Sequence, residues 1–274
     1  MTAGLFDQAG PRMRRRSAIL SFITVAAIVA LIGAGLYRLA ANGSLSSEIW
    51  EVLGDSDLQR LLARGARATV LVAVLGTVFS FLGGVALAVI ASEGSRQLKW
   101  VVRAWIDLLR GLPILMLIFF LFLGGPSIGI NVSPFGALLL GFTLYNGAFM
   151  AEIIRAGMAS LPQGQRDAAL AIGLSTGQAL ALVLLPQAIR VMLPALVNQM
   201  VMILKESSLG FVVGYRELMR SGLLALDFLG ASFALPIFAI LAFLFIGMNL
   251  VLSSVASRLE RGRGRARRVG SFVK

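Results

Sequence analysis

The sequence predicts an all-α protein, a polytopic transmembrane helical bundle of about six spans with both termini in the cytoplasm. Hydrophobic residues make up 58% of the 274 residues and charged residues only 14%, too few charges for the surface of a water-soluble protein of this length. The mean hydropathy is +0.87. Several apolar runs reach the roughly 20 residues that a helix needs to cross the bilayer core.

Six apolar segments define the predicted spans. They are residues 17–39, 68–91, 106–123, 135–154, 188–204 and 232–254. The first segment follows an arginine run and has some features of a signal peptide, with a weak cleavage site at Ala40–Ala41. Because its apolar run is long for a signal peptide, we expect a retained helix, with cleavage as the alternative.

The distribution of basic residues predicts the orientation, since cytoplasmic loops are enriched in Lys and Arg. With both termini inside, 18 of the 25 basic residues face the cytoplasm. The seven outside are Arg38, Arg60, Arg64, Arg67, Lys205, Arg216 and Arg220. The net charge of +12 is concentrated in clusters beside the first and last spans. Such clusters indicate anchoring on an anionic leaflet rather than nucleic-acid binding.

The chain contains neither cysteine nor histidine. Disulfides, thiol catalysis and zinc sites with the usual nitrogen and sulfur ligands are therefore excluded, and the most common general base is missing. We expect no catalytic residue and no metal site, so the chain is not predicted to be an enzyme. The phosphate-binding pattern G-x-x-x-x-G-K-[ST] is also absent from the sequence, so any ATP would bind another chain.

A less apolar segment, residues 155–186, separates the fourth and fifth spans on the basic side. Ser160 with Gln163, and Ser175 with Gln178, have the spacing of helix-capping pairs, and Gly173 between them predicts a break. The first of the two predicted helices has mostly small side chains. Such a short, smooth helix suits insertion into the cleft of a partner; the alternative is an amphipathic helix on the membrane surface.

This segment resembles the EAA loop of bacterial ABC importer permeases. That family has Glu-Ala-Ala, three residues, Gly, nine residues, Ile, one residue and Leu-Pro, and the spacing here matches throughout. The matching residues are Asp167, Ala168, Ala169, Gly173, Val183, Leu185 and Pro186, with Asp167 in place of Glu and Val183 in place of Ile. Residues 66–256 are similar to the polar amino-acid branch, and most similar to glutamate-type permeases.

The resemblance implies a type I importer permease with three parts. Residues 1–65 form a basic cytoplasmic segment, the additional span and an external connection, 66–256 the permease domain, and 257–274 a basic cytoplasmic tail. The implied partners are ABC ATPase subunits that bind ATP and Mg, a second permease, with a different chain favoured over a second copy, and an external solute-binding protein. The ATPase-coupling residues are Gly164, Asp167, Ala168, Ala169, Gly173, Leu185 and Pro186. Among them, Asp167, Ala168 and Ala169 form the docking face. Such a complex in the bacterial plasma membrane imports its substrate by alternating access.

A pathway for a polar amino acid requires polar groups at membrane depth, where they are costly and therefore informative. The candidates are Thr143, Asn146, Asn198, Gln199 and Lys205. Close helix packing is the alternative for Asn146, while Lys205 can extend to the interface or pair with Glu206.

The main rival function is an ion-gradient-driven secondary transporter for amino acids. Such a protein typically has inverted repeats and an acidic residue deep in a span. The sequence indicates neither.

Overall fold

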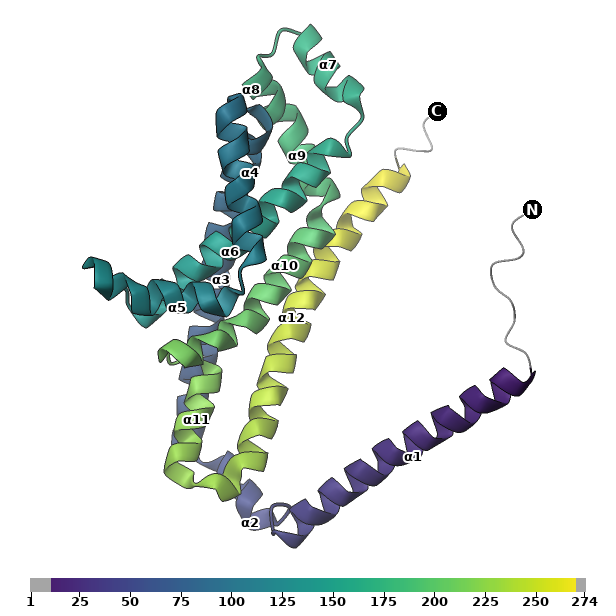
Figure 1. The fold of residues 1–274 in the computed structure, drawn as a ribbon, viewed down its shortest axis with the longest axis vertical. Helices are drawn as coiled ribbons and strands as arrows, with labels where there is room; N and C mark the ends of the chain where they lie inside the picture. The colour runs from purple at the N-terminus through teal and green to yellow at the C-terminus, as the bar shows by residue number, and fades with distance from the viewer. Residues whose placement is uncertain (1–10, 270–274) are drawn as a thin grey trace.

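The computed structural model describes the backbone of residues 11–269 and the side chains of Met13 and residues 15–254. The predicted tail 257–274, with its arginines, lies outside the described side chains. Within the described part, every long element is a helix (Figure 1). Five helices are long and apolar enough to cross a membrane, or six spans if one bent pair counts as a span. The predicted class is confirmed.

The α-helices are α1 (Pro11–Ala41), α2 (Ser47–Trp50), α3 (Ser56–Glu93), α4 (Arg96–Gly111), α5 (Ile114–Gly124), α6 (Pro134–Ala159), α7 (Gln163–Ala171), α8 (Thr176–Gln178), α9 (Leu185–Val191), α10 (Leu193–Glu206), α11 (Leu218–Leu229) and α12 (Ala234–Val269). A π-helical segment, η3 (Ala179–Leu184), joins α8 to α9. Short 3-10 segments are η1 (Glu51–Gly54), η2 (Gly125–Ile128), η4 (Ser207–Val213) and η5 (Ala231–Phe233).

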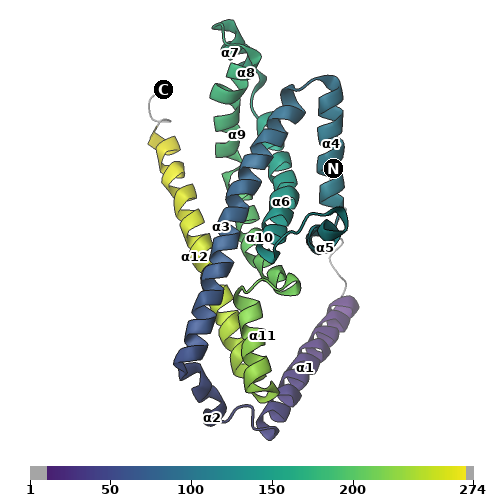
Figure 2. The ribbon, with the colours of Figure 1, turned by 90° about the vertical axis from the view of Figure 1, so that its left-hand side faces the viewer.

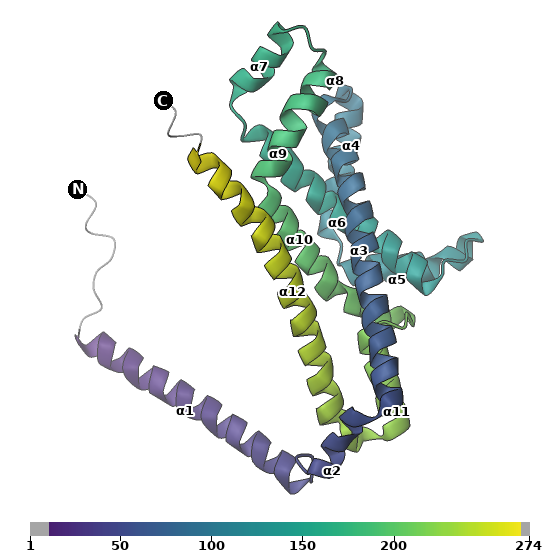
Figure 3. The ribbon, with the colours of Figure 1, turned by 180° about the vertical axis from the view of Figure 1, so that it is seen from behind.

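Helix α1 confirms the first predicted span and stands apart from the other helices (Figures 1 and 3). None of its apolar window is buried by the rest of the chain. Large apolar side chains point outward all round it, among them Phe22, Leu31 and Tyr37. A helix that is apolar on every face belongs in lipid or against another membrane protein.

Helix α3 is the longest described element with defined side chains at both ends, and it runs along most of the molecule (Figure 2). Asp55 caps its start, since its carboxylate accepts hydrogen bonds from the backbone amides of Asp57 (2.9 Å) and Leu58 (2.8 Å). The predicted start at residue 68 is wrong. Hydropathy marked only the apolar part, because the polar first turns of α3 carry the charges of the external connection.

The predicted third span, 106–123, is not one helix. Helix α4 ends at Gly111, α5 begins at Ile114, and the two axes differ by 100°. Pro113 lacks the amide hydrogen needed to continue a helix, and the preceding Leu112 is extended, with ψ 140°, as expected before proline. Helix α5 therefore projects sideways from the bundle (Figures 1 and 3).

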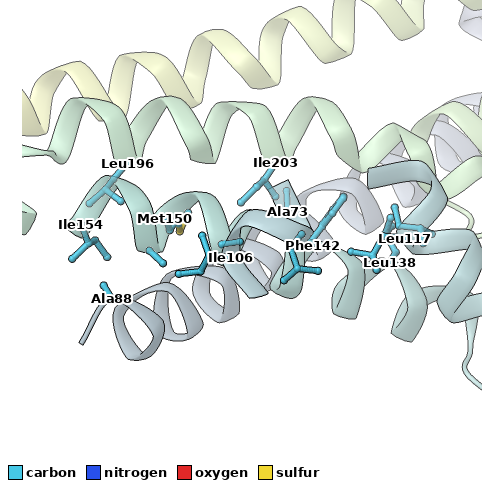
Figure 4. Close-up of a cluster of buried hydrophobic side chains, with 14 of the residues drawn as sticks. Ala73, Ala88, Ile106, Leu117, Leu138, Phe142, Met150, Ile154, Leu196 and Ile203 are labelled. Carbon is cyan, nitrogen blue, oxygen red and sulfur yellow. The ribbon is translucent and has the colours of Figure 1, made fainter. Parts of the chain in front are cut away.

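The main core lies where α3 and α6 pack against each other along much of their length. Its buried side chains come from α3, α4, α5, α6 and α10 (Figure 4). They include Ala88, Ile106, Phe142, Met150 and Ile203. Gly84 permits the close approach, because a Cβ atom there would lie 2.7 Å from Cβ of Met150. Small residues bring membrane helices together in this way.

A second core joins the first half of α3 to α11 and α12. It buries Leu58, Leu62, Leu218, Ala225, Ile237 and Leu241. Here Glu217 is fully buried and caps α11 by accepting hydrogen bonds from the amides of Met219 (2.8 Å) and Arg220 (2.7 Å). The neighbouring amide of Leu218 donates to Thr69 Oγ1 of α3 at 3.0 Å. Polar groups thus fix the start of α11 on α3.

The fifth predicted span, 188–204, is displaced in the structure. A break at Met192 separates α9 from α10, and the apolar helical run that can cross the membrane is Leu193–Val213. Pro194 begins the new helix, where its missing amide hydrogen does no harm. The sixth span is confirmed at Ala231–Ser254.

Candidate functional site

Residues 160–186 form a projection at one end of the bundle, with α7 at its tip (Figures 1 and 2). Gly164, Asp167 and Ala168 are exposed on α7. The helix has nine residues, about 14 Å at 1.5 Å per residue. It is therefore too short to cross a membrane, and most of its surface is available to a partner.

Gly173 ends α7 with a Schellman motif. Its φ is +90°, a conformation that side chains with a Cβ adopt at a cost. The amide of Gly173 donates to the carbonyl of Leu170 at 3.0 Å, and the amide of Leu174 donates to the carbonyl of Ala169 at 3.2 Å. These two bonds satisfy the end of the helix, so the glycine is required for the turn between the two helical parts of the loop.

The two predicted capping pairs have different outcomes. Ser175 and Gln178 form a complete capping box at the start of α8, as predicted. Ser160 does not cap α7, because its hydroxyl donates to the carbonyl of Gly157 at 2.8 Å. The residue before α7 is Pro162. The end of α6 therefore satisfies Ser160 before α7 begins.

The sequence led us to expect Ala169 on an exposed docking face, but the structure buries it. It is only 3% exposed, and α7 packs against η3 of the same loop. Its side chain must be small because the chain's own packing leaves little room. The exposed docking candidates on α7 are Gly164, Asp167 and Ala168.

Leu185 and Pro186 begin α9 directly after the π-helical segment. The amide of Leu185 bonds to the carbonyl of Leu180, five residues back. Proline at 186 has no amide hydrogen to continue the ladder, and a wide turn before it accommodates this loss. The Leu-Pro pair of the predicted motif therefore sets where the loop rejoins the span.

A cleft of about 360 Å³ lies between the loop, the ends of α3 and α6, and the middle of α4. Its charged lining consists of Glu93, Arg103, Arg155 and Arg166. Two of the arginines have carboxylate partners: Arg155 pairs with Glu152, and Arg166 pairs with Glu93 at 2.9 Å. Most of the positive charge in the cleft is thus already neutralised within the chain.

The second candidate site is a cluster of polar side chains between α6 and α10. Asn146 is fully buried on α6. Its Nδ2 atom donates to Oε2 of Glu206 at 3.3 Å, and its Oδ1 atom accepts a hydrogen bond of 2.5 Å from Nε2 of Gln199. Amide groups buried at membrane depth need such partners. We call Asn146, Gln199 and Glu206 the polar cluster.

The other predicted pathway residues lie outside the polar cluster. Asn198 and Lys205 are exposed on α10. Thr143 is half-buried, and its hydroxyl donates to the carbonyl of Leu139 in its own helix at 2.7 Å. The described ion pairs do not include Lys205 with Glu206, so the predicted pairing alternative is not observed. A role of these three residues in a pathway stays a prediction.

Two functional candidates were missed by the sequence analysis. Glu206 lies within the apolar helical run Leu193–Val213, whereas the sequence placed it just beyond the fifth span, 188–204. The guanidinium of Arg110 lies 5.2 Å from the ring centroid of Phe149 on α6, a contact that the sequence did not indicate. An acidic residue near the end of an apolar run was the available signal for Glu206. The contact of Arg110 with Phe149 could not be predicted, because it depends on the bend at Pro113.

Comparison with known proteins identifies the family of the chain. Residues 84–265 match the family described as "Binding-protein-dependent transport system inner membrane component". The chain belongs to this family, and is accordingly a multi-pass protein of the bacterial plasma membrane. The predicted family is confirmed.

Relatives and solved structures support this assignment. The chain is 36% identical over 236 residues to the glutamate transport system permease protein GluD of Corynebacterium glutamicum, covering 84% of this chain and 86% of the relative. It is 34% identical over 208 residues to the glutamine transport system permease protein GlnP of Escherichia coli, covering 73% and 92%. A crystal structure of an amino acid ABC transporter with histidines aligns with a TM-score of 0.68 at 28% identity, covering 76% of this chain and 97% of that one.

Proposed function

We propose that this chain is the membrane-spanning permease subunit of an ATP-driven importer of polar amino acids, with glutamate as the leading substrate. Membership in the family carries the proposal, supported by the names of the two relatives, which concern glutamate and glutamine transport. The ion-gradient-driven carrier is the less favoured function, because the family match is to a binding-protein-dependent transport component.

In this proposal α7 docks on an ATPase subunit that binds ATP and Mg. Gly164, Asp167 and Ala168 face the partner, because they are the exposed small and acidic residues of α7. Gly173 and Leu185-Pro186 act indirectly, by setting the turn and the junction with α9. A second permease completes the pathway, and a different chain is the leading choice. An external solute-binding protein delivers the substrate.

The polar cluster supplies the pathway with groups that suit a zwitterion. The carboxylate of Glu206 attracts the ammonium group of an amino acid, and the amides of Asn146 and Gln199 can exchange their mutual bonds for bonds to substrate. Exposed Arg110 and Lys205 offer positive charge for carboxylates. Because charged groups within spans are costly in lipid, their presence supports a role in transport. Thr143 and Asn198 would lie at the margins of the pathway.

The transport cycle follows alternating access. Moving a two-state protein from 1:99 to 99:1 requires about 5.5 kcal/mol of differential binding. A substrate that must leave again cannot bind one state that much more tightly, so the bias comes from nucleotide on the ATPase. The docked α7 then transmits the conformational change of the ATPase to the spans.

The test is reconstitution of the chain with its neighbouring ATPase, second permease and binding protein in proteoliposomes. We expect the ATPase to co-purify with the chain. Uptake of labelled glutamate should require Mg-ATP inside the proteoliposomes and continue after ionophores dissipate the ion gradients. Competition by unlabelled glutamine, aspartate, arginine and histidine then ranks the substrates. Uptake that needs an ion gradient and ignores ATP would instead establish the carrier.

A further inference from the structure

Helix α7 is tied to α3 by a two-pronged ion pair. The Nη1 atom of Arg166 lies 2.9 Å from Oε1 of Glu93, and its Nη2 atom lies 3.3 Å from Oε2. Glu93 is the last residue of α3, and 73 residues separate the two in sequence. The paired donors of a guanidinium match the two oxygens of a carboxylate, so this geometry fixes orientation as well as distance.

Apart from this pair, the packing of α7 is mainly against η3 of the same loop. Ala169 is its only buried residue, and it packs toward η3 within the same loop. Gln187 of α9 donates to Oε1 of Gln165 at 3.2 Å, a bond between neutral groups. The cleft separates α7 from the ends of the spans, and both Arg166 and Glu93 line it. The ion pair therefore joins its two sides.

The surrounding charges leave this pair intact. Arg155 is occupied by Glu152, with Nε 2.9 Å from Oε2. Arg103 donates to the carbonyl of Ala91 at 3.4 Å, and the ion pairs of the described side chains do not include Arg103 with Glu93. The Arg166 side chain is 45% exposed and that of Glu93 20%, so water screens the pair only in part.

We infer that the Arg166–Glu93 pair is a positioning contact that makes α3 follow α7 when the docked helix moves. The inference rests on the proposed function, because it assigns a route by which motion of the ATPase reaches the spans. Without the pair, α7 would still dock, but its displacement would be absorbed by the cleft. The pair therefore governs how much substrate moves per ATP, not whether the ATPase binds.

Charge reversal in the reconstituted full complex tests this inference. We expect Arg166→Glu and Glu93→Arg each to lower substrate transported per ATP by about two- to five-fold, the range for a well-aligned, partly exposed pair. The double reversal restores the ratio. The matched control is Arg60→Glu, which breaks the exposed Asp57–Arg60 pair at 3.1 Å on the other half of α3 and leaves the ratio unchanged.

The outcomes separate the two proposals. A wild-type complex that holds no ATPase defeats the proposed function itself. Normal ATPase binding with unchanged ratios in the single reversals overturns the positioning role, and so does a double reversal that fails to restore them. Arg166→Lys keeps the charge and loses the fork, so it should retain an intermediate ratio.

A covalent tether provides a second test that does not rely on reversed charges. The chain has no cysteine, so Glu93→Cys with Arg166→Cys creates a unique pair for a short flexible thiol crosslinker. If α3 follows α7, the crosslinked complex continues to transport at the ratio of wild type. Loss of transport on crosslinking, reversed by cleaving the linker, would mean that the two helices must separate.

Discussion

The side-chain amide of Gln199 donates a hydrogen bond to the side-chain oxygen of Asn146, and so joins α10 to α6 within the membrane-crossing part of the chain. Glu206 accepts a hydrogen bond from Nδ2 of the same Asn146 side chain. Removing the middle member would leave two polar groups without their partner, at about 1–3 kcal/mol for each buried group.

Asn146→Leu should therefore lower uptake by about tenfold or more while the chain still binds its ATPase. The measurement is uptake in proteoliposomes beside ATPase co-purification. Asn249→Leu in α12 is the matched control, because Oδ1 of Asn249 is buried without a hydrogen-bond partner among the described residues. If both variants lose uptake equally, the effect is general damage to the spans rather than loss of the polar cluster.

Gly173→Val should uncouple transport from ATP hydrolysis. A left-handed conformation costs an ordinary residue about 1–2 kcal/mol, and a β-branched one more, so the turn after α7 will shift. Gly177→Val is the comparison, since it has no positive φ and its added Cβ would meet open space. Substrate moved per ATP is the quantity to follow, and normal coupling in Gly173→Val would count against the role of the turn.

Burial raises the pKa of Glu217 to about 7. A carboxyl whose pKa is higher in the folded state holds its proton more tightly there, so it stabilises the fold at acid pH. That contribution is complete below the ordinary pKa of 4.5 and is lost as pH rises through about 7. The melting temperature should fall between pH 5 and 8, by about 2–4 °C per kcal/mol lost.

Glu217→Gln should flatten this part of the pH profile, because the amide can still accept from the α11 amides but does not titrate. Thermal unfolding of the detergent-purified chain at a series of pH values provides the check. An equal slope in the variant would assign the pH dependence to other groups.

Scrambling residues 17–39 with their composition kept should leave the melting temperature unchanged, since no residue in the apolar window of α1 is buried by the rest of the chain. A lower melting temperature only in the assembled complex would indicate that α1 packs on another subunit. A lower value in the isolated chain would contradict the separate position of α1.

Much of the fold followed from hydropathy, and the errors have physical causes. Spans are visible because about 20 apolar residues are needed in lipid. The first turns of α3 were missed because their burial depends on Leu218 and Ile237, which are far away in sequence. The right-angle bend at Pro113 was missed because proline in a membrane helix often produces only a kink.

The loop was predicted well where its signals are local. Gly173 and the Ser175–Gln178 box act within a few residues, so their spacing carries the information. Ser160 and Ala169 were misjudged because the neighbours that decide their roles, the end of α6 and η3, are set by the packing of the loop. The polar cluster joins residues 53 to 60 positions apart, which no local pattern can reveal.

Helix α3 has 38 residues, which corresponds to about 57 Å at 1.5 Å per residue and exceeds the roughly 30 Å of a bilayer core. A stiff rod of that length is a lever. Tilting it by about 5° around its midpoint would move each end by about 2.5 Å in opposite directions, from the same rise per residue. A small displacement of α3 at Glu93 would thus produce a displacement in the opposite direction beside α11, on the opposite side of the membrane. No helix would have to bend.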